Sequence, residues 1–182
     1  MDTVLFEIKD ISFNEFYNLV DKSEYTFVFD NAVQLKEQKN IFSVPEMHDC
    51  KFGHVKDLQA ALDAGISWEQ LIVQLAILTG RKECEFVKES IFSLWKQKNW
   101  IVSEMEKVNK TEGLMLTVNV PGGSDLESET GFDVFGAYAQ YRQFGITFGI
   151  LPDAVYDLKY SAVFTELAYQ TKMFNFTQNK RK

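Results

Sequence analysis

The sequence predicts a mainly helical α+β fold, and three observations support this prediction. Residues 53–80 contain a complete set of helix start and stop signals. Apolar residues then recur at helical spacing over residues 83–109 and again over residues 152–176. The first fifty residues have no such long periodicity and contain short runs typical of strands. We therefore expect a small α/β part or arm at residues 1–50 and a helical domain at residues 51–182.

The helix expected to begin after Ser67 has the clearest local signals. Ser67 and Gln70, three residues later, form a capping box. Ile66 and Leu71 fit a hydrophobic staple across the same cap, and Gly80 supplies a left-handed stop. The apolar residues between these ends cover nearly the whole circumference: Trp68, Leu71, Ile72, Val73, Leu75, Ala76, Ile77 and Leu78. We therefore expect this helix at the buried centre of the fold.

Other helices are expected on either side of that segment. Residues 54–64 have the pattern of an amphipathic helix. Residues 83–109 have the pattern of the longest helix, which is expected to end at Gly113. A segment at 132–148 has helical character that its glycines weaken. Pro152 has a favoured first-turn position for a last helix that runs to about residue 176.

The α/β part is predicted from short segments. Residues 3–9 alternate as a strand does, residues 25–29 (YTFVF) are rich in strand formers, and residues 41–44 suggest a third short strand. A short helix at residues 13–20 can be capped by Asp10 or Ser12, and loops are expected at 33–40 and 121–130. Residues 114–120 (LMLTVNV) form an isolated apolar run with β-branched residues.

The composition bounds the class of protein. Of 182 residues, 46% are hydrophobic and 16 are Phe, which is ample for a packed core. The net charge of −7 argues against a nucleic-acid binder, which gathers basic residues to bind phosphates. No run of about 18 apolar residues is present, so we expect no membrane span or membrane binding. The N-terminus lacks a signal-peptide pattern, and we expect a reducing cytosolic setting.

The sequence contains two histidines and two cysteines that could form a site. His48, Cys50, His54 and Cys84 could fill a tetrahedral zinc site, but local ligand pairs such as C-x2-C are missing. Cys50 with His54 could act as nucleophile and base, although neither lies in a recognisable catalytic context. We interpret these residues as core and polar residues at a loop-to-helix junction. The sequence therefore predicts no catalytic residue, no cofactor and no metal.

Two further patterns have simpler interpretations than a ligand site. Residues 121–124 (PGGS) lack the lysine and following helix of a phosphate loop. Alternate carboxylates follow, out of register for a calcium loop: Asp125, Glu127, Glu129 and Asp133. We interpret this stretch as an exposed acidic loop. The three tryptophans are interpreted as core residues: Trp68, Trp95 and Trp100.

The last predicted helix has two apolar stripes. The first contains Tyr156, Tyr160, Val163, Leu167 and Phe174, and the second contains Leu158, Ala162, Tyr169, Met173 and Phe176. One stripe can pack on the core of the chain itself, and the other then needs a cover. We assign the first stripe as the candidate partner-binding surface, with tyrosines that bury a large area while keeping a polar tip. Packing of both stripes within the chain is the alternative.

The helical part of the chain resembles small assembly proteins of tailed bacteriophages. The resemblance rests on FGHVKDLQAALDAGISWEQLIVQLAILTG at 52–80, on FGAYAQYRQFG, and on PDAVYDLKYSAVFTELAYQTK, and it covers about two-thirds of the chain. Tail-assembly chaperones and minor neck or tail proteins are the nearest classes. The resemblance implies no catalytic or cofactor residues.

This resemblance implies a non-enzymatic structural or assembly protein that acts through protein–protein contacts in tail, neck or virion assembly. Its expected partners are other virion or assembly proteins and further copies of itself in a homo-oligomer. Its expected location is the host cytoplasm during assembly, or the virion. Two alternatives stay open: a cytosolic adaptor that binds one partner through its last helix, and a small hydrolase that uses Cys50 and His54.

Overall fold

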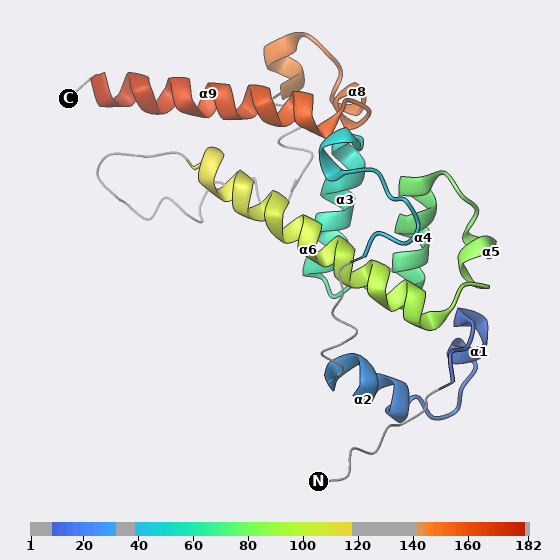
Figure 1. Cartoon of the computed structure of the whole chain (residues 1–182). Helices are drawn as coiled ribbons and strands as arrows, with labels where there is room; N and C mark the ends of the chain where they lie inside the picture. The colour runs from blue at the N-terminus through green and yellow to red at the C-terminus, as the bar shows by residue number, and fades with distance from the viewer. Residues whose placement is uncertain (1–8, 32–38, 118–141, 143, 181–182) are drawn as a thin grey trace. The chain divides into compact units, whose positions relative to one another are not determined.

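The computed structural model describes residues 9–31, 39–117, 142 and 144–180, and these are mainly helical, as predicted (Figure 1). The chain divides into two compact units. Unit 1 comprises Met1–Val44 and Gly65–Glu104, and unit 2 comprises Pro45–Ala64 and Met105–Lys182. Each unit thus combines segments that are distant in the sequence. The boundary passes through the long helix α6.

The regular elements in the described part of unit 1 are all helices. Its elements are α1 (Phe13–Tyr17), α2 (Ser23–Asn31), α4 (Trp68–Thr79), α5 (Glu83–Phe86) and the first part of α6 (Ile91–Met115). Helices α4 and α5 contact each other, as Figure 1 shows. No strand occurs in residues 9–31 or 39–44, so the predicted α/β part is not found there. The expected strand at 3–9 lies almost entirely outside the described residues.

Helix α4 confirms its predicted ends but is not buried all round. The Ser67 hydroxyl accepts from the Gln70 amide while the Gln70 side chain accepts from the Ser67 amide, and Gly80 is left-handed at φ 70°. One face is buried: Leu71, Ile72, Leu75 and Leu78. Val73 and Ile77 on another face are 38% and 43% exposed. The expectation of a fully covered helix was therefore wrong on that side.

The segment predicted as a strand at residues 25–29 is part of helix α2. Its helical spacing places Tyr25 and Phe29 on one face, where both pack on Phe16 with ring centroids 5.5 and 6.1 Å away. Phe29 also stacks on Trp95 at 5.6 Å. Strand propensity is largely a preference for packing on a half-buried surface. Tyr25 and Phe29 find such a surface in a helix that packs its aromatic face.

Residues 41–44, the other predicted strand, form a loop without a partner strand. The Asn40 side chain donates to the Val44 carbonyl at 2.8 Å and accepts from the Val44 amide at 3.0 Å, which closes the loop. The amides of Ile41 and Phe42 both donate to Oε1 of Gln97, at 2.7 and 3.0 Å. Gln97 is fully buried in α6. Its amide therefore replaces the neighbouring strand that these backbone groups would otherwise need.

The long helix predicted at 83–109 is two helices, because the chain breaks between α5 and α6. Ser90 caps α6, with its hydroxyl accepting from the Ser93 amide at 3.3 Å. The carbonyls of Val87 and Glu89 accept from the first amides of α1, Asn14 and Phe13, at 3.0 and 2.9 Å. Carbonyls used in this way cannot continue a helix ladder. Helix α6 then extends past the expected stop at Gly113 and includes the start of the predicted 114–120 run.

Of the two caps predicted for helix α1, Asp10 and Ser12, the helix uses Ser12. Ser12 and Glu15 form a capping box, and the helix ends at Tyr17, short of the expected residue 20. The loop predicted at 121–130 lies outside the described residues, as do most of the loop at 33–40 and of the helix at 132–148. Residues 144–148 of that last segment are helical.

Unit 2 is built from η2 (Met47–Asp49), α3 (Phe52–Asp63), the end of α6, α8 (Pro152–Tyr156) and α9 (Tyr160–Lys180). Helix α3 contacts α8 and α9, and η2 contacts α9. The helix predicted over 152–176 is interrupted at 157–159. There the Leu158 carbonyl accepts from the Phe52 amide at 2.7 Å, and the Tyr160 amide donates to the Cys50 carbonyl at 2.8 Å. Pro152 stands in the first turn of α8, as predicted.

No helix within the described residues is both long enough and apolar enough to cross a membrane.

Candidate functional site

The start of α9 is fixed by a close junction with α3 and α8. Gly53 in α3 lies so near Tyr156 of α8 that a Cβ added there would fall 2.0 Å from the ring. The Tyr156 hydroxyl donates to Asp57 Oδ2 at 2.5 Å. Two exposed ion pairs flank the junction, Lys51 with Asp157 and Lys159 with Asp49. Only glycine allows this approach, so Gly53 lets the end of α8 pack closely on α3.

A polar network centred on Glu112 ties α6 to α3 and α9 within unit 2. The Lys56 ammonium donates to both carboxylate oxygens of Glu112, at 2.7 and 2.9 Å. Nε2 of Gln59 donates to the same carboxylate at 3.0 Å, and the Tyr160 hydroxyl donates at 2.7 Å. The side chains of Lys56 and Glu112 are only 12% and 16% exposed. The network is therefore a largely buried ion pair with neutral donors around it.

The electrostatics of this network stabilise the charged carboxylate. Burial disfavours ionisation of Glu112, but the hydrogen bonds from Lys56, Tyr160 and Gln59 outweigh it and lower the pKa of the carboxyl. Burial, together with the bond to Glu112, raises the pKa of the Tyr160 hydroxyl. The hydroxyl thus remains a donor to a carboxylate at neutral pH. This arrangement holds helices in place and contains no free base.

The five residues predicted to bind a partner differ in exposure. Tyr160 and Val163 are buried, and the Tyr160 hydroxyl donates a hydrogen bond to Glu112. Tyr156 and Leu167 are half-buried. Phe174 is 45% exposed and lies near the end of α9. Most of the first stripe therefore faces unit 2 itself, and Phe174 supplies its main accessible surface.

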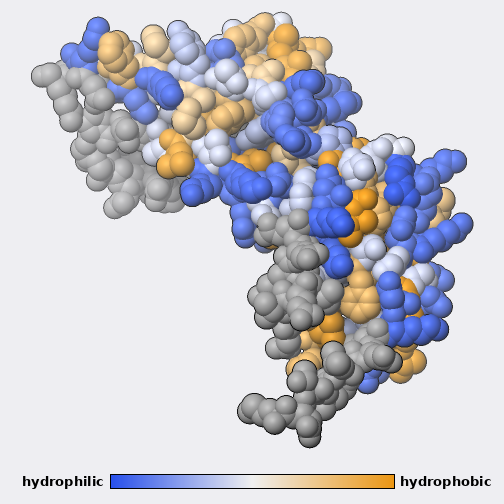
Figure 2. All heavy atoms as spheres, viewed as in Figure 1, coloured by the Kyte–Doolittle hydropathy of each residue, from blue (hydrophilic) through white to orange (hydrophobic). Residues whose placement is uncertain are grey.

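The second stripe of α9 is the exposed one. Tyr169, Met173 and Phe176 are 59%, 46% and 54% exposed, and Ala162 is exposed on the same side. They recur at spacings of three, four and seven, which place them on the helix side opposite Tyr160 and Val163. Figure 2 shows apolar side chains, in orange, at the surface of the α8–α9 part of the chain. The candidate functional site is this exposed stripe of Ala162, Tyr169, Met173 and Phe176.

A shallow pocket of about 360 Å³ lies beside α8 in the same unit. It is lined by Arg142, Gly145, Ile146, Gly149, Ile150, Leu151 and Pro152. Among these seven lining residues, only Arg142 has a titratable side chain. The described lining therefore offers no acid–base pair.

The histidines and cysteines were considered above as ligands of a metal and as a nucleophile–base pair. No group of three or more His, Cys, Asp or Glu residues suited to a metal occurs among the described residues. Cys50 is buried, and burial with the nearby charge of Asp49 raises the pKa of its thiol to about 11. Burial lowers the pKa of His54, whose ring lies edge-on to Tyr156 at 5.6 Å. A thiol held protonated is a poor nucleophile.

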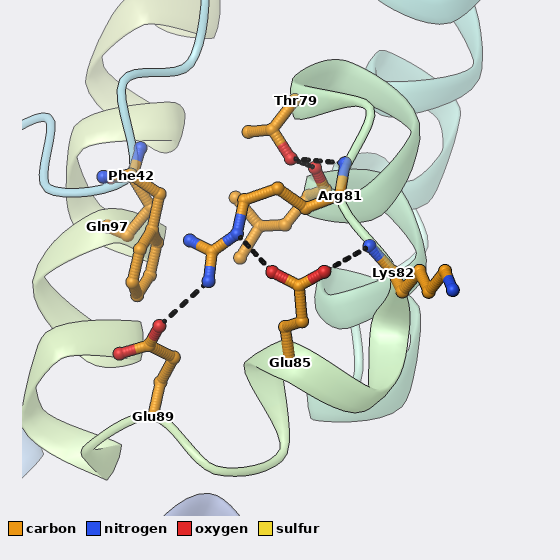
Figure 3. Close-up of polar contacts among 8 residues, drawn as sticks. Phe42, Thr79, Arg81, Lys82, Glu85, Glu89 and Gln97 are labelled. Atoms are coloured by element: carbon orange, nitrogen blue, oxygen red, sulfur yellow. Dashed lines mark hydrogen bonds and ion pairs between the residues drawn. The ribbon is translucent and has the colours of Figure 1, made fainter.

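The strongest polar cluster of unit 1 surrounds Arg81 (Figure 3). Its guanidinium donates to Glu85 and Glu89, both at 3.0 Å, and lies 4.6 Å from the centre of the Phe86 ring. Hydrogen bonds to Glu89 and Glu85 raise the pKa of Arg81. Phe42 lies beside the same guanidinium (Figure 3). The carbon of the guanidinium is 5.7 Å from the centre of the Phe42 ring. Two carboxylates neutralise this cation, so the cluster joins α5 to the 41–44 loop and is not an anion site.

Of the three tryptophans interpreted as core residues, only Trp95 is buried, and Trp68 and Trp100 are half-buried. Trp68 packs among Phe13, Phe16 and Phe29 with ring centroids 5.9 to 6.4 Å away. The 121–124 turn and the acidic residues after it lie outside the described residues. The Glu112 network was not predicted, although a signal exists. An acid in the last turns of a helix opposes the helix dipole and indicates a nearby cation.

Comparison with known proteins gives no relative: no family model, no curated protein and no solved structure matches this chain.

Proposed function

We propose that this chain is a non-enzymatic assembly protein of a tailed bacteriophage, which acts in tail, neck or virion assembly through protein–protein contacts. The observation that supports this most is the exposed apolar stripe on α9. A helix needs one apolar face to pack on its own unit, and α9 uses Tyr160 and Val163 for that. The outward face of Tyr169, Met173 and Phe176 is then surplus to folding.

The chemistry of the stripe suits a protein partner. Aromatic residues are enriched in interface centres because they bury large areas at low cost in conformational freedom. Methionine is enriched there too, and its flexible thioether side chain adapts to the shape of a partner. The resemblance of the helical part to phage assembly proteins favours the same kind of action. Such a protein meets its partners in the host cytoplasm while particles are built. Cys50 argues against the hydrolase alternative, because its thiol is buried and its raised pKa keeps it protonated.

The test follows the chain during particle production. An epitope-tagged wild-type chain is expected to co-sediment with phage particles or assembly intermediates on a density gradient, and Met173→Asp is expected to abolish this. Val20→Asp is the matched control, because Val20 is a fully exposed apolar residue of unit 1. Recovery of the wild-type chain only outside these fractions, bound to a host protein, would instead favour the adaptor. Equal behaviour of Met173→Asp and the wild type would exclude the stripe as the contact.

A further inference from the structure

The charges of α9 are few and are arranged around the centre of the exposed stripe. The chain as a whole has a net charge of −7, which opposes contact between copies. Helix α9 contains only three charged residues, Glu166, Lys172 and Lys180. Its outward face can therefore approach a second α9 with less of the acidic repulsion that the net charge of the chain causes.

Glu166 and Lys180 lie at equal distances from Met173 along the helix. Each is seven residues away, which is two turns or roughly 10 Å at the rise of an α-helix. A two-fold axis through Met173 reverses the direction of the second helix. Glu166 of each copy then falls opposite Lys180 of the other, and Tyr169 falls beside Phe176 of the other.

We propose that two copies of this chain pair through their α9 helices, antiparallel and centred on Met173. This rests on the proposed function in that it names the first partner of the exposed stripe as a second copy. The contact is isologous, so each complementary pair occurs twice. A parallel pairing in register would set Glu166 against Glu166 and Lys180 against Lys180. The two Glu166–Lys180 pairs favour the antiparallel arrangement, although it also brings Lys172, next to Met173 in the sequence, near Lys172 of the other copy.

Both charged side chains are available for this contact. Glu166 accepts one long hydrogen bond from Gln170 of its own helix, at 3.4 Å. The Lys180 ammonium lies 4.4 Å from the centre of the Phe176 ring, at the end of the stripe. Within the described residues neither forms an ion pair. An intermolecular pair would therefore break no ion pair that the described structure contains.

Charge reversal with the full-length chain tests the arrangement by sedimentation equilibrium at low salt. The wild type is expected to be a dimer whose dissociation constant rises with ionic strength, since exposed ion pairs are screened. Glu166→Lys and Lys180→Glu should each weaken it roughly tenfold, because each turns two attractive pairs into two repulsive ones. The double variant should recover the wild-type value to within about twofold.

Three results would overturn the pairing: a monomeric wild type, single reversals without effect, or a double variant that fails to recover. Met173→Asp should be monomeric with its helical circular dichroism intact, whereas Val20→Asp should remain dimeric. A monomeric wild type that still enters phage fractions would refute the pairing and leave the proposed function standing. A dimer that shows the predicted charge behaviour but is absent from those fractions would support the pairing and refute the proposed function.

Discussion

Replacing Glu112 by Gln removes one charge from the largely buried network that joins α3, α6 and α9. Gln preserves the shape of the side chain and keeps an oxygen for the Tyr160 hydroxyl. The Lys56 ammonium, whose side chain is 12% exposed, loses its counter-ion at 2.7 Å. Breaking a buried ion pair by removing one partner costs about 3–5 kcal/mol. Some access to water and the hydrogen bonds that Gln retains reduce this, and we expect a loss of roughly 2–3 kcal/mol in unfolding free energy.

Urea unfolding followed by circular dichroism measures this loss as a lower midpoint with an unchanged slope. A double-mutant cycle with Lys56→Met isolates the pair from the other contacts of Glu112. We expect a coupling of about 1–2 kcal/mol, since the second substitution removes the uncompensated charge that the first one leaves. A Glu112→Gln variant within about 0.5 kcal/mol of the wild type would refute the argument. So would strictly additive effects in the cycle.

The pH dependence gives an independent measure of the same network. The folded pKa of Glu112 is lowered, so its carboxylate contributes stability above the unfolded pKa of about 4.3. That contribution is lost as the pH falls through the folded value, because protonation then costs the pair with Lys56. The wild type should therefore lose more stability than Glu112→Gln on acidification, and the two curves should converge at low pH. Parallel curves would contradict the assignment.

Three further predictions concern packing and thiol chemistry. Gly53→Ala should lower the unfolding free energy and the melting temperature, because its Cβ would lie 2.0 Å from the Tyr156 ring and displace it; an unchanged melt would contradict this. Leu75→Ala should cost roughly 2–5 kcal/mol in urea, as for a fully buried leucine, and a melting temperature within a degree or two of wild type would refute it. A thiol reagent at pH 8 should modify exposed Cys84 quickly and buried Cys50 only after denaturation, and equal rates would count against burial of Cys50.

Elements whose signals lie within a few residues were predictable from the sequence. Such elements are the capping boxes at Ser12 and Ser67 and the left-handed Gly80. Each depends on side chains and backbone groups within four residues of one another. Their energies are local, so the pattern alone identifies them. The same signals say nothing of what covers a helix. That is why Val73 and Ile77 were expected to be buried and are exposed.

Elements that depend on distant partners were not predictable. The break between α5 and α6 exists because the carbonyls of Val87 and Glu89 accept from amides of α1, more than seventy residues earlier in the sequence. Residues 41–44 resemble a strand, yet their amides are satisfied by the side chain of Gln97. Strand formers in α2 pack equally well on a helix face. In each case a tertiary contact outweighs a local preference of about 1 kcal/mol or less.

In helix α9, residue spacing predicts some features and not others. Spacing alone defines two apolar stripes, because residues three, four and seven apart share a side of any helix. It does not define which stripe faces the unit, since that depends on the rotation of the helix about its axis. The bond from the Tyr160 amide to the Cys50 carbonyl and that from the Tyr160 hydroxyl to Glu112 set this rotation at the first turn. Val163 then follows inward, and Tyr169, Met173 and Phe176 must face outward along the rest of the helix.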